Sequence, residues 1–239
     1  MWLIFEFEKN VILQGKKYSK LNLKFMMKEE NFNIFGSEKT AFLNENGHSL
    51  FLKRLLNPNG QHGQGDLFLK RFVKYVLKNP FDETQKWTVE KEKKAGKKGR
   101  VDLIVRSKEL IIVIENKIGA DDQYAQLYRY WRNKIYGEKK PYSEDGYNKS
   151  WERGILVYIT PDGRKPSNVS KQRPYDTGTK YDGFPNELPM DKITRISYKK
   201  DICDWLGNCL HEIDKNENPR LYSILEQYIE WIEYYLKVE

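Results

Sequence analysis

Cysteine is scarce in this sequence, and long hydrophobic runs are missing. Only two of the 239 residues are cysteines, Cys203 and Cys209. Neither has a partner at a metal-ligand spacing such as Cys-x-x-Cys, which argues against a structural zinc site. So few cysteines suit a reducing cytoplasm. No segment approaches the roughly 20 apolar residues that cross a membrane, and the apolar start, residues 1–7, is too short and contains Glu6. We therefore expect a cytoplasmic protein without a membrane partner.

Internal repeats and a clear interdomain linker are also missing. We therefore predict a single α/β domain over residues 1–239, with a central mixed β-sheet flanked by helices. Residues 1–35 give no readable pattern and are treated as an N-terminal extension. Residues 164–191 are rich in Pro, Gly, Asn, Ser, Thr and Lys and predict a long irregular insertion. Such an insertion is either a flap over a substrate or a disordered segment.

Positive charge is abundant. The net charge is +8 and the isoelectric point about 9.2, which suits a polyanionic partner such as nucleic acid. The alternative is a basic protein with no nucleic-acid role. Residues 90–100 concentrate five lysines and one arginine. Lys97, Lys98 and Arg100 are candidates for contacts with a phosphate backbone, although a solvated hairpin tip explains the same composition.

The most informative stretch covers residues 99–117. Two aliphatic runs, 101–105 and 110–114, flank a short polar break, and this pattern predicts an antiparallel hairpin. If the turn centres between Lys108 and Glu109, Asp102 lies directly opposite Glu115, with about 5 Å between their Cβ atoms. Lys117 is two residues after Glu115 and projects from the same face of the strand. Two carboxylates and an ammonium group are thus expected to converge.

This arrangement predicts a metal site. Two carboxylates so close repel each other, and one takes up a proton unless a cation neutralises them. Mg²⁺ takes one or two protein carboxylates and completes its shell with water and phosphate oxygens, and Mn²⁺ is a reasonable substitute. With Lys117 orienting a water molecule, the set is suited to metal-assisted hydrolysis of a phosphodiester. The alternative is a half-exposed strand with a cross-strand ion cluster.

A family resemblance enters at these residues. Asp102 followed by Glu115-Asn116-Lys117 resembles the core motif of the PD-(D/E)XK nuclease superfamily, with Val101 where many members have proline. Other segments resemble one bacterial branch of it over residues 31–210, in this order: Glu45-Asn46-Gly47-His48-Ser49, His62-Gly63-Gln64-Gly65-Asp66, Gln126-Leu127-Tyr128-Arg129-Tyr130 and Tyr158-Ile159-Thr160-Pro161-Asp162-Gly163. The ordered set is far more specific than the Asp…Glu-x-Lys motif alone.

The resemblance implies a restriction-endonuclease-like core and a Mg²⁺-dependent nuclease that acts on nucleic acid, with DNA the first choice. It implies that Glu45 helps to hold the metal, that Gln126 aligns the nucleophile or a phosphate, and that Tyr130 supports Gln126 at the substrate. The carbonyl of Asn116 is a further candidate metal ligand beside Asp102 and Glu115. Many such nucleases dimerise to cut two strands, so a homodimer is one option.

Each of these roles has a simpler alternative. Glu45 lies at the start of a predicted helix, where any carboxylate interacts favourably with the helix dipole. Gln126 and Tyr130 are one turn apart on what could be an ordinary amphipathic helix. The whole fold could serve as a nucleic-acid-binding or protein-interaction module with little or no catalysis. The third alternative is a structural protein on which the charged hairpin is only a surface feature.

Hydrophobic periodicity and turn residues predict the remaining elements. Residues 154–159 form an apolar run of strand length, which predicts a buried strand parallel to 110–114. A helix that starts with an aspartate, Asp121 or Asp122, is expected before it. The other predicted elements are strands at 87–90 and 193–198 and helices at 46–56, 67–77, 201–210 and 221–236.

Overall fold

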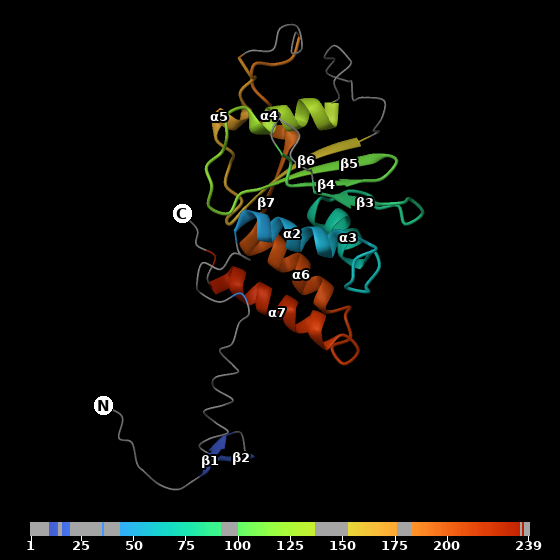
Figure 1. Ribbon diagram of the computed structural model, residues 1–239, viewed down its shortest axis with the longest axis vertical. Coiled ribbons are helices and arrows are strands. Elements are labelled where there is room, and N and C mark those ends of the chain that lie inside the picture. Colours follow the sequence, from blue (N-terminus) through green and yellow to red (C-terminus); the bar gives the residue numbers. More distant parts are fainter. Residues whose placement is uncertain are drawn as a thin grey trace, which may run out of the picture.

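A five-stranded mixed sheet organises the chain (Figure 1). The computed structural model describes residues 10–13, 16–19, 35, 44–91, 100–136, 153–175, 183–234 and 236. The sheet has the order β3-β4-β5-β6-β7. Its strands are β3 (Thr88–Glu90), β4 (Leu103–Arg106), β5 (Leu110–Asn116), β6 (Arg153–Thr160) and β7 (Ile193–Ser197). The first three are antiparallel, and β5, β6 and β7 run parallel. A second, two-stranded sheet pairs β1 (Asn10–Leu13) with β2 (Lys16–Ser19).

The central hairpin has the register that the sequence predicts. Leu103 pairs with Ile114, and Ile104 pairs with Val113. The turn is closed by the N–H of Ser107, which donates to the carbonyl of Leu110 at 2.9 Å. One step beyond the last pair, Asp102 lies beside Glu115. This register confirms the predicted pairing. The register is fixed because the short polar break leaves room for only one turn.

Helices cover both faces of the sheet (Figure 1). One face carries α2 (Glu45–Leu56), α3 (Leu67–Arg71), α6 (Cys203–Leu210) and α7 (Pro219–Tyr234); the other carries α4 (Gln126–Tyr130) and α5 (Asn168–Lys171). Side chains alternate along β5, so Ile112 and Ile114 belong to the larger hydrophobic cluster, under α2. Ile111 and Val113 belong to the smaller cluster, under α4. We call these the α2 face and the α4 face.

The strand β5 is buried on both faces, and all seven of its residues are buried. A strand buried in this way lies inside the sheet, between two neighbouring strands. One neighbour is β4, and the other is β6, which runs parallel to β5 as predicted, with Glu115 aligned to Tyr158. On the α4 face the chain packs very closely against β6. A Cβ atom at Gly154 would lie 2.3 Å from Cγ2 of Ile135, so only glycine allows this approach.

Three predicted helices differ from the observed ones. The segment predicted as 67–77 is α3 followed by a π-helical turn, Phe72–Val76. The segment predicted as a helix over 201–210 begins inside a π-helical turn, Tyr198–Ile202, and continues as α6 from Cys203. The helix expected to start at an aspartate begins instead at Gln126, after Ala125 with a positive φ of 54°. That prediction is wrong because the carboxylate of Asp122 does not cap the helix. It accepts hydrogen bonds from residues distant in sequence, the hydroxyl of Tyr158 and the N–H of Ser167, both at 2.7 Å.

Parts of the predicted irregular insertion are ordered. It contains α5 and an isolated bridge between Gln172 and Glu187. Both cysteines are buried, and burial raises the pKa of each thiol to about 12, so neither is a reactive thiolate. Within the described part of the chain, no helix is both long enough and apolar enough to cross a membrane.

Candidate active site

Asp102, Glu115 and Lys117 meet where β4 begins and β5 ends. The Nζ atom of Lys117 lies 3.3 Å from Oε1 of Glu115. The backbone N–H of Asn116 donates to Oδ2 of Asp102 at 2.9 Å, which ties the acid of one strand to the backbone of the next. Glu115 and Lys117 project toward the α4 face, as alternation from Val113 requires. The structure therefore brings together the three charged groups that the sequence singled out.

Burial makes this cluster electrostatically unusual. Exposed fractions are 9% for Asp102, 3% for Glu115 and 4% for Lys117. Burial, followed by the charge of Asp102, raises the pKa of Glu115 to about 8, and Lys117 opposes the rise. Burial also raises the pKa of Asp102, against the hydrogen bond from Asn116. Within the described residues Oε2 of Glu115 is buried without a hydrogen-bond partner, so the cluster has an oxygen to offer to a cation.

The helix α2 contributes Glu45 at its first residue. Asn44 caps this helix by accepting the N–H of Gly47 at 2.9 Å. Oε1 of Glu45 accepts the N–H groups of Ile118 and Ala120 at 3.1 and 3.0 Å, and so fixes the loop that follows Lys117. The charge of Glu45 also raises the pKa of Glu115. Glu45 therefore belongs to the acidic cluster and also shapes its edge.

Asn116 turns to the other side of the sheet. Its amide nitrogen donates to the carbonyl of Glu45 and to Oγ of Ser49, both at 3.2 Å. The hydroxyl of Ser49 donates to the same carbonyl at 2.8 Å. These bonds lock the end of β5 onto α2, so the side chain of Asn116 anchors the strand from the α2 face.

Gln126 and Tyr130 face the acidic cluster from α4. The amide nitrogen of Gln126 donates to Oε1 of Glu115 at 2.8 Å and to the hydroxyl of Tyr130 at 3.0 Å. That hydroxyl donates to the carbonyl of Arg100 at 2.7 Å. Both residues are buried. The contacts orient Glu115, whereas the sequence analysis placed Gln126 on the nucleophile or a phosphate.

Two basic side chains, Lys91 and Arg100, border the cluster on the side of β3. The Nζ atom of Lys91 donates to Oδ1 of Asn46 at 3.2 Å, and the guanidinium of Arg100 donates to the same oxygen. The charge of Lys91 lowers the pKa of Asp102, which shows that the two groups are close. Lys97 and Lys98, the other predicted phosphate contacts, lie outside the described residues.

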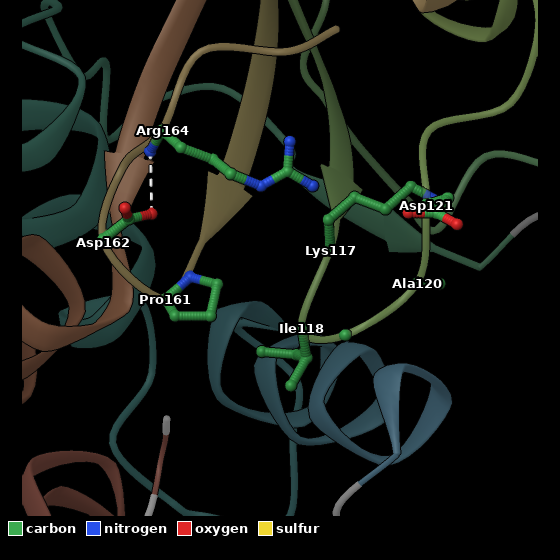
Figure 2. Close-up of a pocket in the computed structure, with 8 residues that line it drawn as sticks. Lys117, Ile118, Ala120, Asp121, Pro161, Asp162 and Arg164 are labelled. Atoms are coloured by element: carbon green, nitrogen blue, oxygen red, sulfur yellow. Dashed lines mark hydrogen bonds between the residues drawn. The ribbon is translucent and has the colours of Figure 1, made fainter. Parts of the chain in front are cut away.

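A pocket of about 50 Å³ opens beside Lys117 (Figure 2). This volume holds several water molecules. Its walls are the loop that leaves β5 and the turn that leaves β6: Lys117, Ile118, Gly119, Ala120, Asp121, Pro161, Asp162 and Arg164. The side chain of Arg164 extends over the pocket on the side of Lys117 (Figure 2).

Arg164 was not among the predicted site residues, although the sequence contains a signal for it. It directly follows the turn Pro161-Asp162-Gly163, which ends a strand predicted to run parallel to β5. Parallel neighbours end at the same edge of a sheet, so residues after β6 had to lie near those after β5.

The donor set fits a small, hard cation. Asp102, Glu115 and Glu45 bring three carboxyl groups together beside the single amino group of Lys117. Among the described residues no three His, Cys, Asp or Glu side chains form a complete metal-binding group. The pair of Asp102 and Glu115 matches the preference of Mg²⁺, which takes one or two protein carboxylates and completes its shell with water and phosphate.

Comparison with known proteins agrees with this geometry. Searches of curated proteins and of solved structures found no match. A family model described as the PD-(D/E)XK nuclease superfamily matches residues 32–230. The match covers the whole five-stranded sheet, the helices on both of its faces except the last turn of α7, and every member of the acidic cluster. The mixed sheet with helices on both faces is consistent with the restriction-endonuclease-like core of that superfamily. The chain belongs to the PD-(D/E)XK nuclease superfamily.

Proposed function

We propose that this protein is a Mg²⁺-dependent nuclease that hydrolyses phosphodiester bonds of DNA. One observation carries the proposal: Asp102 and Glu115 form a buried acidic pair on adjacent strands, with the ammonium group of Lys117 at 3.3 Å from Glu115. Two buried carboxyl groups so close together are costly to ionise. A site that binds a divalent cation gives them a purpose.

Asp102 and Glu115 would hold the ion, with the carbonyl of Asn116 as a further ligand, and Glu45 would adjust the metal shell from the edge of the cluster. When bound, Mg²⁺ supplies Lewis-acid stabilisation of the charge that develops on the phosphate oxygens. Lys117 lines the pocket and presents its ammonium group to the attacking water and to that charge. Gln126 holds Glu115 in one orientation through its 2.8 Å hydrogen bond, and Tyr130 holds Gln126.

Plasmid nicking tests the proposal directly. The full chain is incubated with supercoiled DNA in Mg²⁺, in Mn²⁺ and in EDTA. We expect nicking with either metal and none in EDTA. Lys117→Ala and Asp102→Ala should both abolish it. Lys108→Ala is the matched control, because this exposed lysine lies at the opposite end of the same hairpin; its activity should equal that of the unmodified chain.

Two outcomes would contradict the proposal. Nicking that survives both substitutions would show that the activity comes from elsewhere in the chain or from a contaminant. DNA binding without turnover in any metal would favour the binding-module alternative. Metal binding is measured separately, from the rise in the thermal unfolding midpoint on adding Mn²⁺, which Asp102→Ala should remove.

A further inference from the structure

The charged residues form a row along one edge of the sheet. β3 ends beside the start of β4, β4 starts beside the end of β5, and β5 and β6 end together. Lys91 after β3, Asp102 before β4, Lys117 after β5 and Arg164 after β6 therefore follow one another across the strand order. Neighbouring strands are about 4.8 Å apart, so the row spans about 14 Å. Lys91 and Arg164 stand at the two ends of the row, with Asp102 and Lys117 between them.

Arg164 is held in place by its surroundings. Its guanidinium lies 3.6 Å from Oδ2 of Asp122, whose side chain is only 2% exposed. It also lies over the ring of Tyr158, 5.8 Å from the centroid. The backbone N–H of Arg164 donates to Oδ1 of Asp162 at 2.9 Å, which fixes the turn (Figure 2). The preceding Gly163 has a φ of 77°, which glycine adopts without strain.

Asp122 does not neutralise Arg164 in the way a structural ion pair would. Its two oxygens already accept the hydroxyl of Tyr158 and the N–H of Ser167, both at 2.7 Å. The guanidinium is farther away, and the side chain of Arg164 remains 43% exposed. It keeps donors directed at the pocket that Lys117 lines. A planar fork of N–H donors is well suited to bidentate recognition of a phosphate.

We propose that Arg164 binds a phosphate of the nucleic-acid strand, adjacent to the phosphate at which that strand is cut. Asp122 is the residue that positions Arg164. This inference rests on the proposed function and adds the direction of the substrate. The strand crosses the edge of the sheet from the group of Lys91 and Arg100, over the acidic cluster, to Arg164. At about 3.4 Å per nucleotide, the row of about 14 Å accommodates some four nucleotides.

The salt dependence of DNA binding tests this contact. Affinity of a labelled single-stranded DNA oligonucleotide is measured by fluorescence anisotropy in Mg²⁺, with Lys117→Ala as the background so that the probe stays intact. Adding Arg164→Ala should weaken binding about tenfold at 0.1 M salt. It should also reduce the slope of log affinity against log salt by about 0.7, the value for one phosphate contact on a single strand. Arg220→Ala, at an exposed arginine of α7, is the matched control and should change neither quantity.

Arg164→Lys separates the charge from the fork of donors. We expect it to restore the slope, because the charge is kept, but only part of the affinity, because a lysine cannot bind in a bidentate manner. Asp122→Asn tests positioning. It should weaken binding when Arg164 is present and add no further loss to Arg164→Ala, whereas a purely structural Asp122 would give additive losses.

The outcomes distinguish this inference from the proposed function. An unchanged slope in Arg164→Ala, with normal nicking by the unmodified chain, overturns the phosphate contact and leaves the nuclease. A reduced slope in a chain that never nicks DNA supports the contact and overturns the nuclease. Absence of DNA binding by every variant overturns both.

Discussion

The two faces of the sheet differ sharply at the end of β5, although the residues concerned are consecutive. Glu115 and Lys117 project toward α4 into a group of ionisable side chains, where burial raises the pKa of Glu115 and, among the residues that the structure describes, Oε2 of Glu115 has no hydrogen-bond partner. Asn116, between them, projects toward α2, where its amide nitrogen makes two hydrogen bonds. The polar groups around it on this face are uncharged.

The α2 face continues as a network of aromatic and hydrogen-bonded side chains behind Asn116. A hydrogen bond of 2.5 Å joins Nδ1 of His48 on α2 to the hydroxyl of Tyr228 on α7. The ring of His48 lies 5.4 Å from that of Tyr198 and 5.0 Å from that of Trp231. The difference teaches that the buried carboxyl groups with raised pKa values gather on the α4 face, while the α2 face fixes the same strand through the side chain of Asn116. We therefore expect substitutions on the α4 face to affect cleavage and substitutions on the α2 face to affect stability.

The largest effect is expected at Asp102. Asp102→Asn keeps the shape of the side chain and an oxygen for the N–H of Asn116, but removes one charge from the cluster. Cleavage of DNA in Mg²⁺ should fall by about 10³-fold, the scale seen when one electrostatic group is removed from an active site. The unfolding midpoint in EDTA at pH 8 should stay the same or rise, because a buried repulsion is gone. A lower midpoint would show that Asp102 is structural.

A pH series should reveal the cost of Glu115. Its pKa is about 8 in the fold against an ordinary value of 4.5, so between these pH values the folded chain keeps a proton that the unfolded chain has lost. The free energy of unfolding of the metal-free protein should therefore decrease as the pH rises from about 4.5 to 8, by an amount on the order of a few kcal/mol.

Two comparisons test whether Glu115 causes this pH dependence. Glu115→Gln should reduce it, because glutamine does not titrate, and the raised pKa of Asp102 accounts for the dependence that remains. Adding Mn²⁺ at pH 8 should stabilise the unmodified chain and leave Glu115→Gln almost unchanged. Urea unfolding at several pH values measures both. A free energy of unfolding that does not change with pH in the unmodified chain would contradict a buried Glu115 with a raised pKa.

On the α2 face, Tyr228→Phe should reduce stability and spare cleavage. The substitution removes the partner of Nδ1 of His48 in a buried site, which typically costs about 1–3 kcal/mol. The unfolding midpoint should fall, while nicking well below that midpoint should stay within about threefold. Tyr234→Phe is the control, since Tyr234 lies on the same helix and is 76% exposed. A large loss of activity in a still folded Tyr228→Phe would break the division between the faces.

The smallest effect is expected at Tyr130. Tyr130→Phe removes the hydrogen bonds to Gln126 and to the carbonyl of Arg100 and leaves Gln126 bonded to Glu115. We expect cleavage to fall about fivefold through looser positioning of Glu115, consistent with the loss of about 1 kcal/mol for one hydrogen bond. Tyr75→Phe, at a tyrosine that is 51% exposed, should have no effect. Measuring initial nicking rates separates the two.

Local rules account for the parts of the site that the sequence predicted. A short polar break fixes the register of the hairpin, and the period of two puts Glu115 and Lys117 on one face. The parallel pairing of β6 followed from a continuous apolar run of strand length. These predictions depend on contacts close in sequence or on periodicity, which is why they were confirmed.

Long-range contacts account for the rest. Asp122 resembles a helix cap in sequence, but its partners are Tyr158 and Ser167, more than 30 residues away. The role of Gln126 in orienting Glu115 depends on how α4 packs on the sheet. Arg164 became visible as a site residue only when the ends of β5 and β6 were aligned. None of these partners can be read from local spacing.

Ala125, the residue before α4, has a left-handed backbone conformation and connects several of these features. A non-glycine residue in this conformation costs about 1–2 kcal/mol, yet Ala125 adopts it, fully buried, with its N–H bonded to the carbonyl of Val169 in α5 at 2.8 Å. The stretch that carries Arg164 and Ser167 therefore also sets the angle at which Gln126 approaches its acid. A displacement of that stretch by an incoming strand would be transmitted to Glu115 through the backbone, so that substrate engagement and alignment of the acid respond together.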